Sequence, residues 1–475
     1  MPKPSLAVRA LPAVIALLAV GSASSAGAQI LQRDYASAGP PLAAAPADPA
    51  IATALQQISS QDIQHIIATL VSFHTRSTLS SMAHDLPKGQ GINAAAAWLE
   101  AQLRQISKDC HGCLEVHRDT FLEQPQDRIP QPTSISNVYA ILRGSDPVQA
   151  RRLYLVTGHY DSRNSDTLDA HGAAPGANDD ASGVAVSLQC ARVLSKLHPL
   201  ASVVFVAVAG EEQGLNGSRH LARLAKAEGW QLEGVLNNDI VGGNTTPGDA
   251  LQDKSVVRVF SEGLPAAATP EQARALEGLG YGNDSPSRQL ARAVLDAALS
   301  YAGAVQPVME FRHDRFLRGG DHTSFNQEGY AAVRFTEWRE DYNHQHQTPR
   351  TTDGTEFGDL LKFVDFQYVA QVARLNAATL AGLSAAPPPP THVRLLTKVL
   401  DNDSELAWDA GTASPPGTRY EIVWRETTAP QWQFAQQVSE TQVRLPVSKD
   451  NVIFGVRALD PAGHRSLAVI PMPER

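Results

Sequence analysis

The sequence predicts an α/β fold whose sheet is covered by helices on both faces, followed by a small all-β sandwich. Between about residues 150 and 240, short continuously apolar runs alternate with segments of helical periodicity, which is typical of buried strands and crossover helices. In residues 391–475 the helical periodicity disappears, and alternating apolar segments are separated by turn residues. With 475 residues, 43% of them hydrophobic, the chain has room for two or three domains.

The individual elements follow from the same patterns. Apolar residues at helical spacing predict helices over residues 51–73, 91–106, 181–197, 215–228, 289–302 and 357–383. Short apolar or alternating runs predict strands over residues 114–121, 134–142, 153–157, 203–209, 234–238 and 331–335. The segment 242–287 is long and rich in turn residues, so we expect an insertion that shapes a pocket together with the loop 338–353.

The N-terminus has the features of a secretory signal peptide. A short basic segment precedes the apolar run 11–20, and Ala26-Gly27-Ala28 is typical of a cleavage site. The apolar run is too short for a membrane anchor, and no later segment is long and apolar enough to span a bilayer. We therefore expect an exported protein that is periplasmic or secreted.

Changes in composition along the chain predict the boundaries of its domains and linkers. The predicted order is a signal peptide (1–28), a leader (29–50), an α/β domain (51–384), a proline-rich linker (385–390) and a sandwich (391–475). Alternations such as Leu406/Trp408 in the sandwich resemble those of a fibronectin type III module. Such a module serves either to stabilise the preceding domain or to attach it to a binding partner or surface, and the sequence leaves both roles open.

Charge and cysteine content exclude several classes of protein. A formal net charge of −9 without a basic cluster argues against binding to nucleic acid or to an anionic membrane. Three cysteines are too few for a disulfide scaffold or a cysteine-rich zinc module. In an exported protein, Cys110 and Cys113 favour a local disulfide over the alternative of a redox pair, and Cys190 is expected in the core.

Polar residues that can bind metal follow the apolar strands. In chain order they are His159 and Asp161 (GHYDS), Asp179 (PGANDDASG), Glu211 and Glu212 (GEEQGLNGS), Asp239 (NND) and His322 (GGDHTSF). Ligands bind at the carboxyl ends of strands in open α/β sheets, so we expect these side chains to share one site. Two histidines and three carboxylates suit two zinc ions that share a bridging carboxylate and a water. The other carboxylate of the Glu211-Glu212 pair would then be free to act as a general base.

These motifs, in combination and in order, resemble the co-catalytic zinc aminopeptidase family, which includes bacterial leucyl aminopeptidases and, more distantly, glutamate carboxypeptidases. The resemblance covers roughly residues 50–383 and implies a mixed central sheet flanked by helices. It implies the metal ligands His159, Asp179, Glu212, Asp239 and His322, with Asp179 bridging two zinc ions. It also implies that Glu211 is the general base, that Asp161 orients His159, and that the Asp179–Asp180 peptide is cis.

One position departs from the family pattern. Some members have a tyrosine directly before the last histidine ligand, where this chain has Asp321, so the oxyanion partner must come from elsewhere. Tyr342 in the polar stretch EDYNHQHQT is our candidate. His344 and His346 in the same stretch either line the pocket or belong to an exposed loop.

The function predicted from these residues is that of a secreted zinc aminopeptidase acting on peptides. The first alternative is a carboxypeptidase for acidic dipeptides, in which Arg312, Arg315 and Arg318 would hold the substrate carboxylate. A glutaminyl cyclase, which uses one zinc ion, is disfavoured by the intact His159 motif. A non-catalytic binding protein is disfavoured because no predicted ligand is missing. No motif specifies an oligomeric state.

Overall fold

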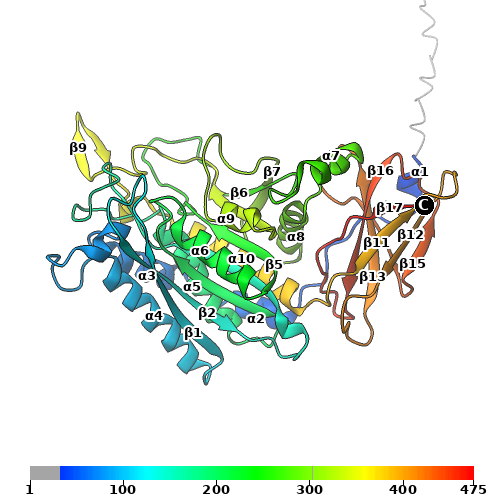
Figure 1. Ribbon diagram of the computed structural model, residues 1–475, viewed down its shortest axis with the longest axis horizontal. Helices are drawn as coiled ribbons and strands as arrows, with labels where there is room; N and C mark the ends of the chain where they lie inside the picture. The colour runs from blue at the N-terminus through cyan, green and yellow to red at the C-terminus, as the bar shows by residue number, and fades with distance from the viewer. Residues whose placement is uncertain (1–32, 302) are drawn as a thin grey trace, which may run out of the picture. The chain divides into compact units, whose positions relative to one another are not determined.

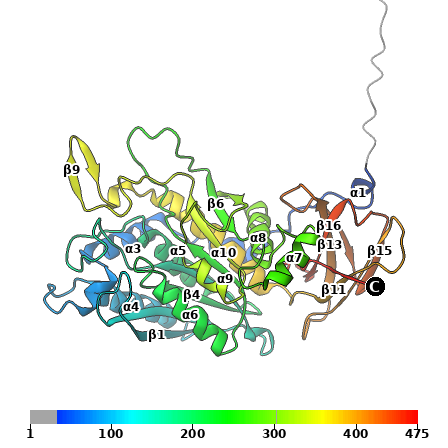
Figure 2. The same ribbon diagram turned by 45° about the horizontal axis from the view of Figure 1, so that its top comes forward.

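The computed structural model describes residues 33–301 and 303–475, which form an α/β domain and a C-terminal β-sandwich (Figures 1 and 2). The predicted signal peptide, residues 1–28, lies outside the described residues. Within the described ranges, no helix is both long enough and apolar enough to cross a membrane.

An eight-stranded mixed sheet lies at the centre of the α/β domain (Figure 1). From one edge to the other, its strands are β1 (Leu114–Glu123), β2 (Thr133–Leu142), β4 (Ser202–Val208), β3 (Arg152–His159), β5 (Gln231–Asn238), β8 (Ala332–Glu337), β6 (Val256–Ser261) and β7 (Gln306–Glu310). The four central strands β4, β3, β5 and β8 run parallel, whereas β2 and β6 pair antiparallel with this central group. The carboxyl ends of the central strands therefore meet at one edge of the sheet.

Helices cover both faces of this sheet. The helices of the described residues are α1 (Asp34–Ser37), whose Tyr35 belongs to the core of the sandwich, α2 (Pro49–Leu55), α3 (Ser60–Ser72), α4 (Ile92–Asp109), α5 (Ala181–Leu194), α6 (Asn216–Ala227), α7 (Pro270–Gly278), α8 (Pro286–Ser300), α9 (His322–Gln327) and α10 (Phe366–Ala385). Helices α4, α5, α8 and α10 contact one face of the sheet, and α6 and α9 contact the other.

The two helical layers explain the sequence pattern of the strands. All residues of β4 are buried, and successive side chains point to opposite faces. Val203 and Phe205 belong to the core that includes α5, whereas Val204 and Val206 belong to the core that includes α6. A strand with two buried faces needs apolar residues at every position, which is why β3 and β4 are continuously apolar rather than alternating.

Residues 391–475 form the predicted β-sandwich. One sheet contains β11 (Thr391–Leu396), β12 (Ser404–Asp409), β15 (Gln442–Leu445) and β17 (Met472–Glu474), and the other contains β13 (Arg419–Glu426), β14 (Phe434–Val438) and β16 (Val452–Leu459). Trp408 and Trp424 come from different sheets and are both buried in the shared core.

Several segments differ from the prediction. The helix predicted over 51–73 is divided into α2 and α3, because Ser59 accepts hydrogen bonds from the backbone of Gln61 and Asp62 and so begins a new helix. The segment 242–287 is more than an insertion, since it supplies strand β6 of the central sheet. The helix predicted over 357–383 begins later, as α10, after a hairpin of β9 (Arg350–Thr352) and β10 (Thr355–Phe357).

Two local predictions are confirmed. Cys110 and Cys113 form a disulfide, and Cys190 is a buried free cysteine. The leader, in contrast, is not a separate segment. The backbone N–H of Leu42 donates to the carbonyl of Gln433 at 2.7 Å, and that of Ala435 donates to the carbonyl of Pro40 at 3.1 Å. Part of the predicted leader therefore pairs with the C-terminal sandwich.

A buried ionic cluster also joins the α/β domain to the sandwich. Asp284, just before α8, lies 2.9 Å from Nη1 of Arg292 in α8 and 2.7 Å from Nη2 of Arg425 in β13. The side chains of all three residues are almost inaccessible to solvent. One carboxylate thus serves two buried guanidinium groups that come from different parts of the fold.

We expect Asp284→Ala to lower the free energy of unfolding by about 3–5 kcal/mol, because it leaves buried guanidinium groups without their carboxylate. Urea denaturation followed by circular dichroism would measure the loss. The matched control is Glu100→Ala, which removes an i, i+4 pair with the largely exposed Arg104 and should cost less than about 0.5 kcal/mol. Equal losses in the two variants would contradict a structural role for the cluster.

Candidate metal centre

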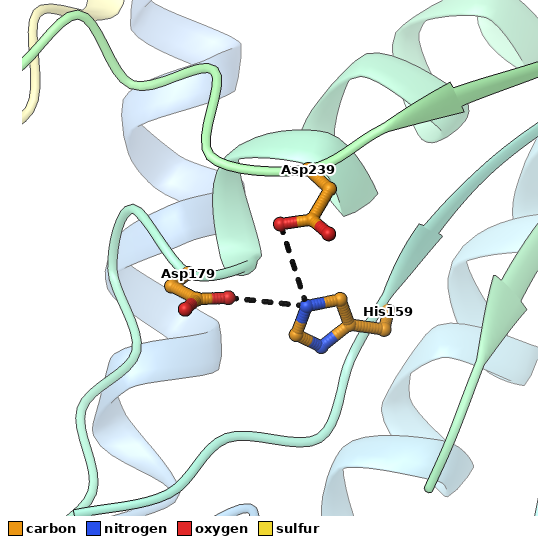
Figure 3. Close-up of side chains that lie close together, drawn as sticks. All are labelled: His159, Asp179 and Asp239. Atoms are coloured by element: carbon orange, nitrogen blue, oxygen red, sulfur yellow. Dashed lines mark ion pairs between the residues drawn. The ribbon is translucent and has the colours of Figure 1, made fainter. Parts of the chain in front are cut away.

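The ends of β3 and β5 bring three of the predicted residues together (Figure 3). His159 is the last residue of β3, Asp239 directly follows β5, and Asp179 lies just before α5. His159 Nε2 lies 3.1 Å from Asp179 Oδ1 and 3.8 Å from Asp239 Oδ1, and all three side chains are buried. One donor atom from each residue lies within 4.8 Å of the others, so one metal ion could bind all three.

A second group adjoins the first and consists of Asp179, Glu212 and His346. His346 Nε2 lies 2.8 Å from Asp179 Oδ2 and 3.2 Å from Glu212 Oε1. Asp179 therefore presents Oδ1 to the first group and Oδ2 to the second. This is the arrangement expected of a carboxylate that bridges two metal ions.

The predicted ligand His322 does not belong to either group. It is the first residue of α9, and its Nε2 lies 3.0 Å from the carbonyl oxygen of His313 and 3.6 Å from Asp314 Oδ2. The structure places His346 beside Asp179 and Glu212 instead, which corrects the prediction. The sequence pattern favours His322 because this residue follows a glycine pair at the start of a predicted helical turn, whereas His346 lies in a polar loop whose path the sequence does not reveal. The only signal for His346 was the polar stretch that also contains Tyr342.

Asp161 lies behind His159, on the side away from the carboxylates. Its carbonyl oxygen is 3.2 Å and its Oδ1 is 3.5 Å from His159 Nδ1. The same carboxylate accepts hydrogen bonds from the backbone N–H groups of Glu211 at 3.3 Å and Glu212 at 3.2 Å. Acceptors at Nδ1 favour a proton there, which directs the lone pair of Nε2 toward Asp179 and Asp239.

The backbone around Asp179 is also held by carboxylates. Asp359 accepts hydrogen bonds from the backbone N–H groups of Asn178 at 2.8 Å and Asp179 at 2.7 Å. Asp180 accepts from the backbone N–H of His159 at 3.0 Å and caps α5 through Gly183. The Asp179–Asp180 peptide is cis, as the family resemblance implies. Asp359 was not among the predicted residues, since nothing near it in the sequence marks it as part of a site.

Burial and the charges of the two groups shift the pKa of several side chains at the site. Burial raises the pKa of Glu211 well above its usual value, and Asp239 and Glu212 add to this effect against the opposing influence of His159. Burial alone would raise the pKa of Asp179, but His346 and His159 bring it well below its usual value. Burial would lower the pKa of His346, but Glu212 and Asp179 raise it to about 10. Asp179 is thus held ionised, whereas Glu211 has an increased affinity for a proton.

The donor atoms fit divalent cations. Among the described residues, the buried atoms His159 Nε2 and Glu212 Oε1 face ionisable neighbours at 3.1 and 3.2 Å but make no well-aligned hydrogen bond. Buried polar atoms are rarely left unsatisfied, and coordination to a metal would satisfy both. Imidazole nitrogens and carboxylate oxygens in this proportion are the ligands of zinc sites with an open position.

A cavity of about 530 Å³ opens beside these groups. It is lined by Arg128, Arg163, Glu211, Glu212, Leu215, Leu317, Arg318, Gly319, Tyr342, Gln345, His346 and Gln347. The loop 338–353 contributes to the lining as predicted, but the segment 242–287 contributes none of these residues. Tyr342 lies on the cavity wall and is 63% exposed.

Comparison with known proteins identifies the family. Residues 137–362 match Peptidase family M28. A probable zinc metalloprotease of Pyrenophora teres f. teres is 43% identical over 432 residues, which are 90% of this chain and 88% of that protein. A probable zinc metalloprotease of Pyricularia oryzae is 43% identical over 435 residues, covering 90% and 85% of the two chains.

Solved structures with a similar fold have lower sequence identity. LapB from Legionella pneumophila aligns with a TM-score of 0.49 and 18% identity over 71% of this chain and 75% of that one. A glutaminyl cyclase of Bacteroides thetaiotaomicron aligns with a TM-score of 0.45 and 15% identity over 68% and 98%. The α/β sheet and its adjoining carboxylate and histidine groups are those of a metal-dependent hydrolase. The chain belongs to peptidase family M28.

Proposed function

We propose that this chain is an exported zinc aminopeptidase that removes N-terminal residues from peptides. Membership of family M28 and the zinc metalloprotease relatives support a zinc peptidase. The observation that carries the proposal is the pair of adjoining groups that share Asp179, with Glu211 beside them on the wall of the cavity. Export rests on the signal-peptide pattern of residues 1–28.

Each group would hold one zinc ion. His159, Asp179 and Asp239 would bind the first, and Asp179, Glu212 and His346 the second. When bound, two such ions polarise a carbonyl and lower the pKa of a water molecule. Asp161 acts as a positioning residue, because it fixes the imidazole of His159 and the backbone of the Glu211-Glu212 pair.

Glu211 is the general base of the proposed reaction. It lines the cavity but belongs to neither ligand group, so its carboxylate remains available to the substrate. It takes a proton from the attacking water and delivers it to the leaving amine. Tyr342, on the same cavity wall, would donate a hydrogen bond to the oxyanion of the tetrahedral intermediate.

The carboxypeptidase alternative depends on three arginines that would hold the substrate carboxylate, and their positions give it little support. Arg315 pairs with Asp314 and Glu340, and Arg312 is exposed and stacks on Phe316. Of the three arginines proposed to hold a substrate carboxylate, only Arg318 lines the cavity. A cyclase with a single zinc ion needs only one such group, whereas each of the two groups here offers three donor residues.

Hydrolysis of Leu-p-nitroanilide tests the proposed function. We expect the purified protein to cleave this substrate but not its N-acetylated form, because an aminopeptidase requires a free amine. The chelator 1,10-phenanthroline should abolish cleavage, whereas its non-chelating isomer 1,7-phenanthroline should have no effect. Cleavage of the acetylated substrate, or cleavage that survives the chelator, would contradict a metal-dependent aminopeptidase.

A further inference from the structure

The cavity beside Glu211 contains three arginines, and their charges are unequally balanced. Arg318 Nη1 lies 3.1 Å from Glu340 Oε2, and Arg163 Nε lies 2.9 Å from Glu212 Oε2. Arg128 has no carboxylate within 4.0 Å in the described part of the chain, and its Nη1 donates to the carbonyl oxygen of Glu212 at 2.9 Å. At least one guanidinium group on the cavity wall is therefore free to attract an anion.

Arg163 is held by two residues of the second ligand group. Its Nε lies 2.9 Å from Glu212 Oε2, and its Nη2 lies 2.6 Å from His346 Nδ1. Within the described residues, its Nη1 makes no hydrogen bond.

Arg163 Nη1 and the Nε and Nη2 groups of Arg128 therefore remain available to an anion at the cavity wall. Guanidinium groups bind carboxylates through two parallel hydrogen bonds, which are among the stronger ones in proteins. Of the two carboxylates that line the cavity, Glu212 is paired with Arg163 and Glu211 has no arginine partner, whereas three arginines share the same wall.

We propose that Arg163 and Arg128 form a subsite that binds a carboxylate of the peptide substrate next to the scissile bond. This inference rests on the proposed function, because it names the substrates which that site prefers. The carboxylate can be the side chain of an acidic N-terminal residue or the C-terminus of a dipeptide. Arg163 and Arg128 are thus specificity residues, whereas Arg318 is largely committed to Glu340.

Matched pairs of substrates distinguish the two sources of the carboxylate. For the side chain, kcat/KM is measured with Glu-p-nitroanilide and with its neutral isostere Gln-p-nitroanilide. For the C-terminus, it is measured with Leu-Leu and with Leu-Leu-amide. We expect the carboxylate form to be preferred about tenfold or more in at least one pair, since that is the discrimination of one charged hydrogen-bonded contact.

Binding to the zinc-loaded protein gives a readout that does not depend on turnover. Calorimetry compares glutamate with glutamine, and D-Leu-Leu with D-Leu-Leu-amide, whose D-residue protects the peptide bond from cleavage. Where a substrate pair shows a preference, the matching ligand with the carboxylate should bind about tenfold more tightly than its neutral partner. Zinc content is measured in parallel, because Arg163 also contacts Glu212.

Arg163→Gln and Arg128→Gln should bring the ratio between the carboxylate and neutral forms close to one, for kcat/KM and for affinity. Both variants should keep their zinc content. Arg163→Lys should retain part of the preference for the carboxylate form. Arg312→Gln is the control, because Arg312 is exposed and does not line the cavity. The proposal is wrong if neither Arg163→Gln nor Arg128→Gln lowers the preference for the carboxylate form in either substrate pair. If the protein cleaves none of the substrates, the aminopeptidase proposal fails, while the calorimetric ratios still decide whether the subsite exists.

Discussion

Replacing Glu211 by glutamine should lower kcat for Leu-p-nitroanilide by at least about 100-fold, which is the contribution typical of a general base. Glutamine has nearly the same shape as glutamate but cannot accept the proton of the attacking water. Because Glu211 belongs to neither ligand group, the variant should keep its full zinc content. Stopped-time assays at saturating substrate and metal analysis of the same samples measure both quantities.

The control for this substitution is Glu356→Gln, which changes a glutamate in the hairpin strand β10 that pairs with Lys362 outside the cavity. It should leave kcat unchanged. Turnover of Glu211→Gln within a few fold of the unmodified enzyme would show that another group takes the proton. Loss of zinc from Glu211→Gln would instead show that Glu211 is a ligand.

We expect the second-largest effect from His346→Ala, which should reduce bound zinc from two equivalents to about one and abolish most of the activity. The reason is that His346 supplies the only nitrogen of the second group, while the first group remains intact. Inductively coupled plasma mass spectrometry on protein whose fold has been checked by circular dichroism measures the metal content.

His322→Ala is the matched comparison, since His322 is the histidine that the sequence pattern favoured. It should retain two equivalents of zinc, because its Nε2 lies against the carbonyl of His313 rather than against Asp179. The opposite result, one equivalent in His322→Ala and two in His346→Ala, would restore the ligand set implied by the family resemblance.

The central part of the site could be predicted because parallel strands impose a simple geometry. His159 and Asp239 each stand at the end of a short run with an apolar centre (LYLV and GVL), and such runs predict buried parallel strands. Parallel strands that lie side by side bring their carboxyl ends together, so these residues meet wherever the strands pair. Asp179 could be added because it lies just before the helix that follows β3.

Other features depend on contacts between segments that are far apart in the chain. His346 lies in an irregular loop and has a φ of 56°, a conformation that few residues other than glycine adopt. Asp359 holds the backbone of Asp179 across 180 positions of sequence. Strand β6 lies in a turn-rich segment without strong periodicity, and it becomes a strand because it pairs with β8 and β7.

The α/β class, the sandwich, the local disulfide and the residues at the ends of the central strands could all be predicted from the amino-acid order. These features depend on the period of apolar residues or on neighbours in the chain, which sequence records directly. That His346 rather than His322 meets Asp179 and Glu212, and that three arginines line the cavity, became visible in the folded structure. Loops have no periodic pattern, and the position of their side chains is fixed by packing and hydrogen bonds to distant segments.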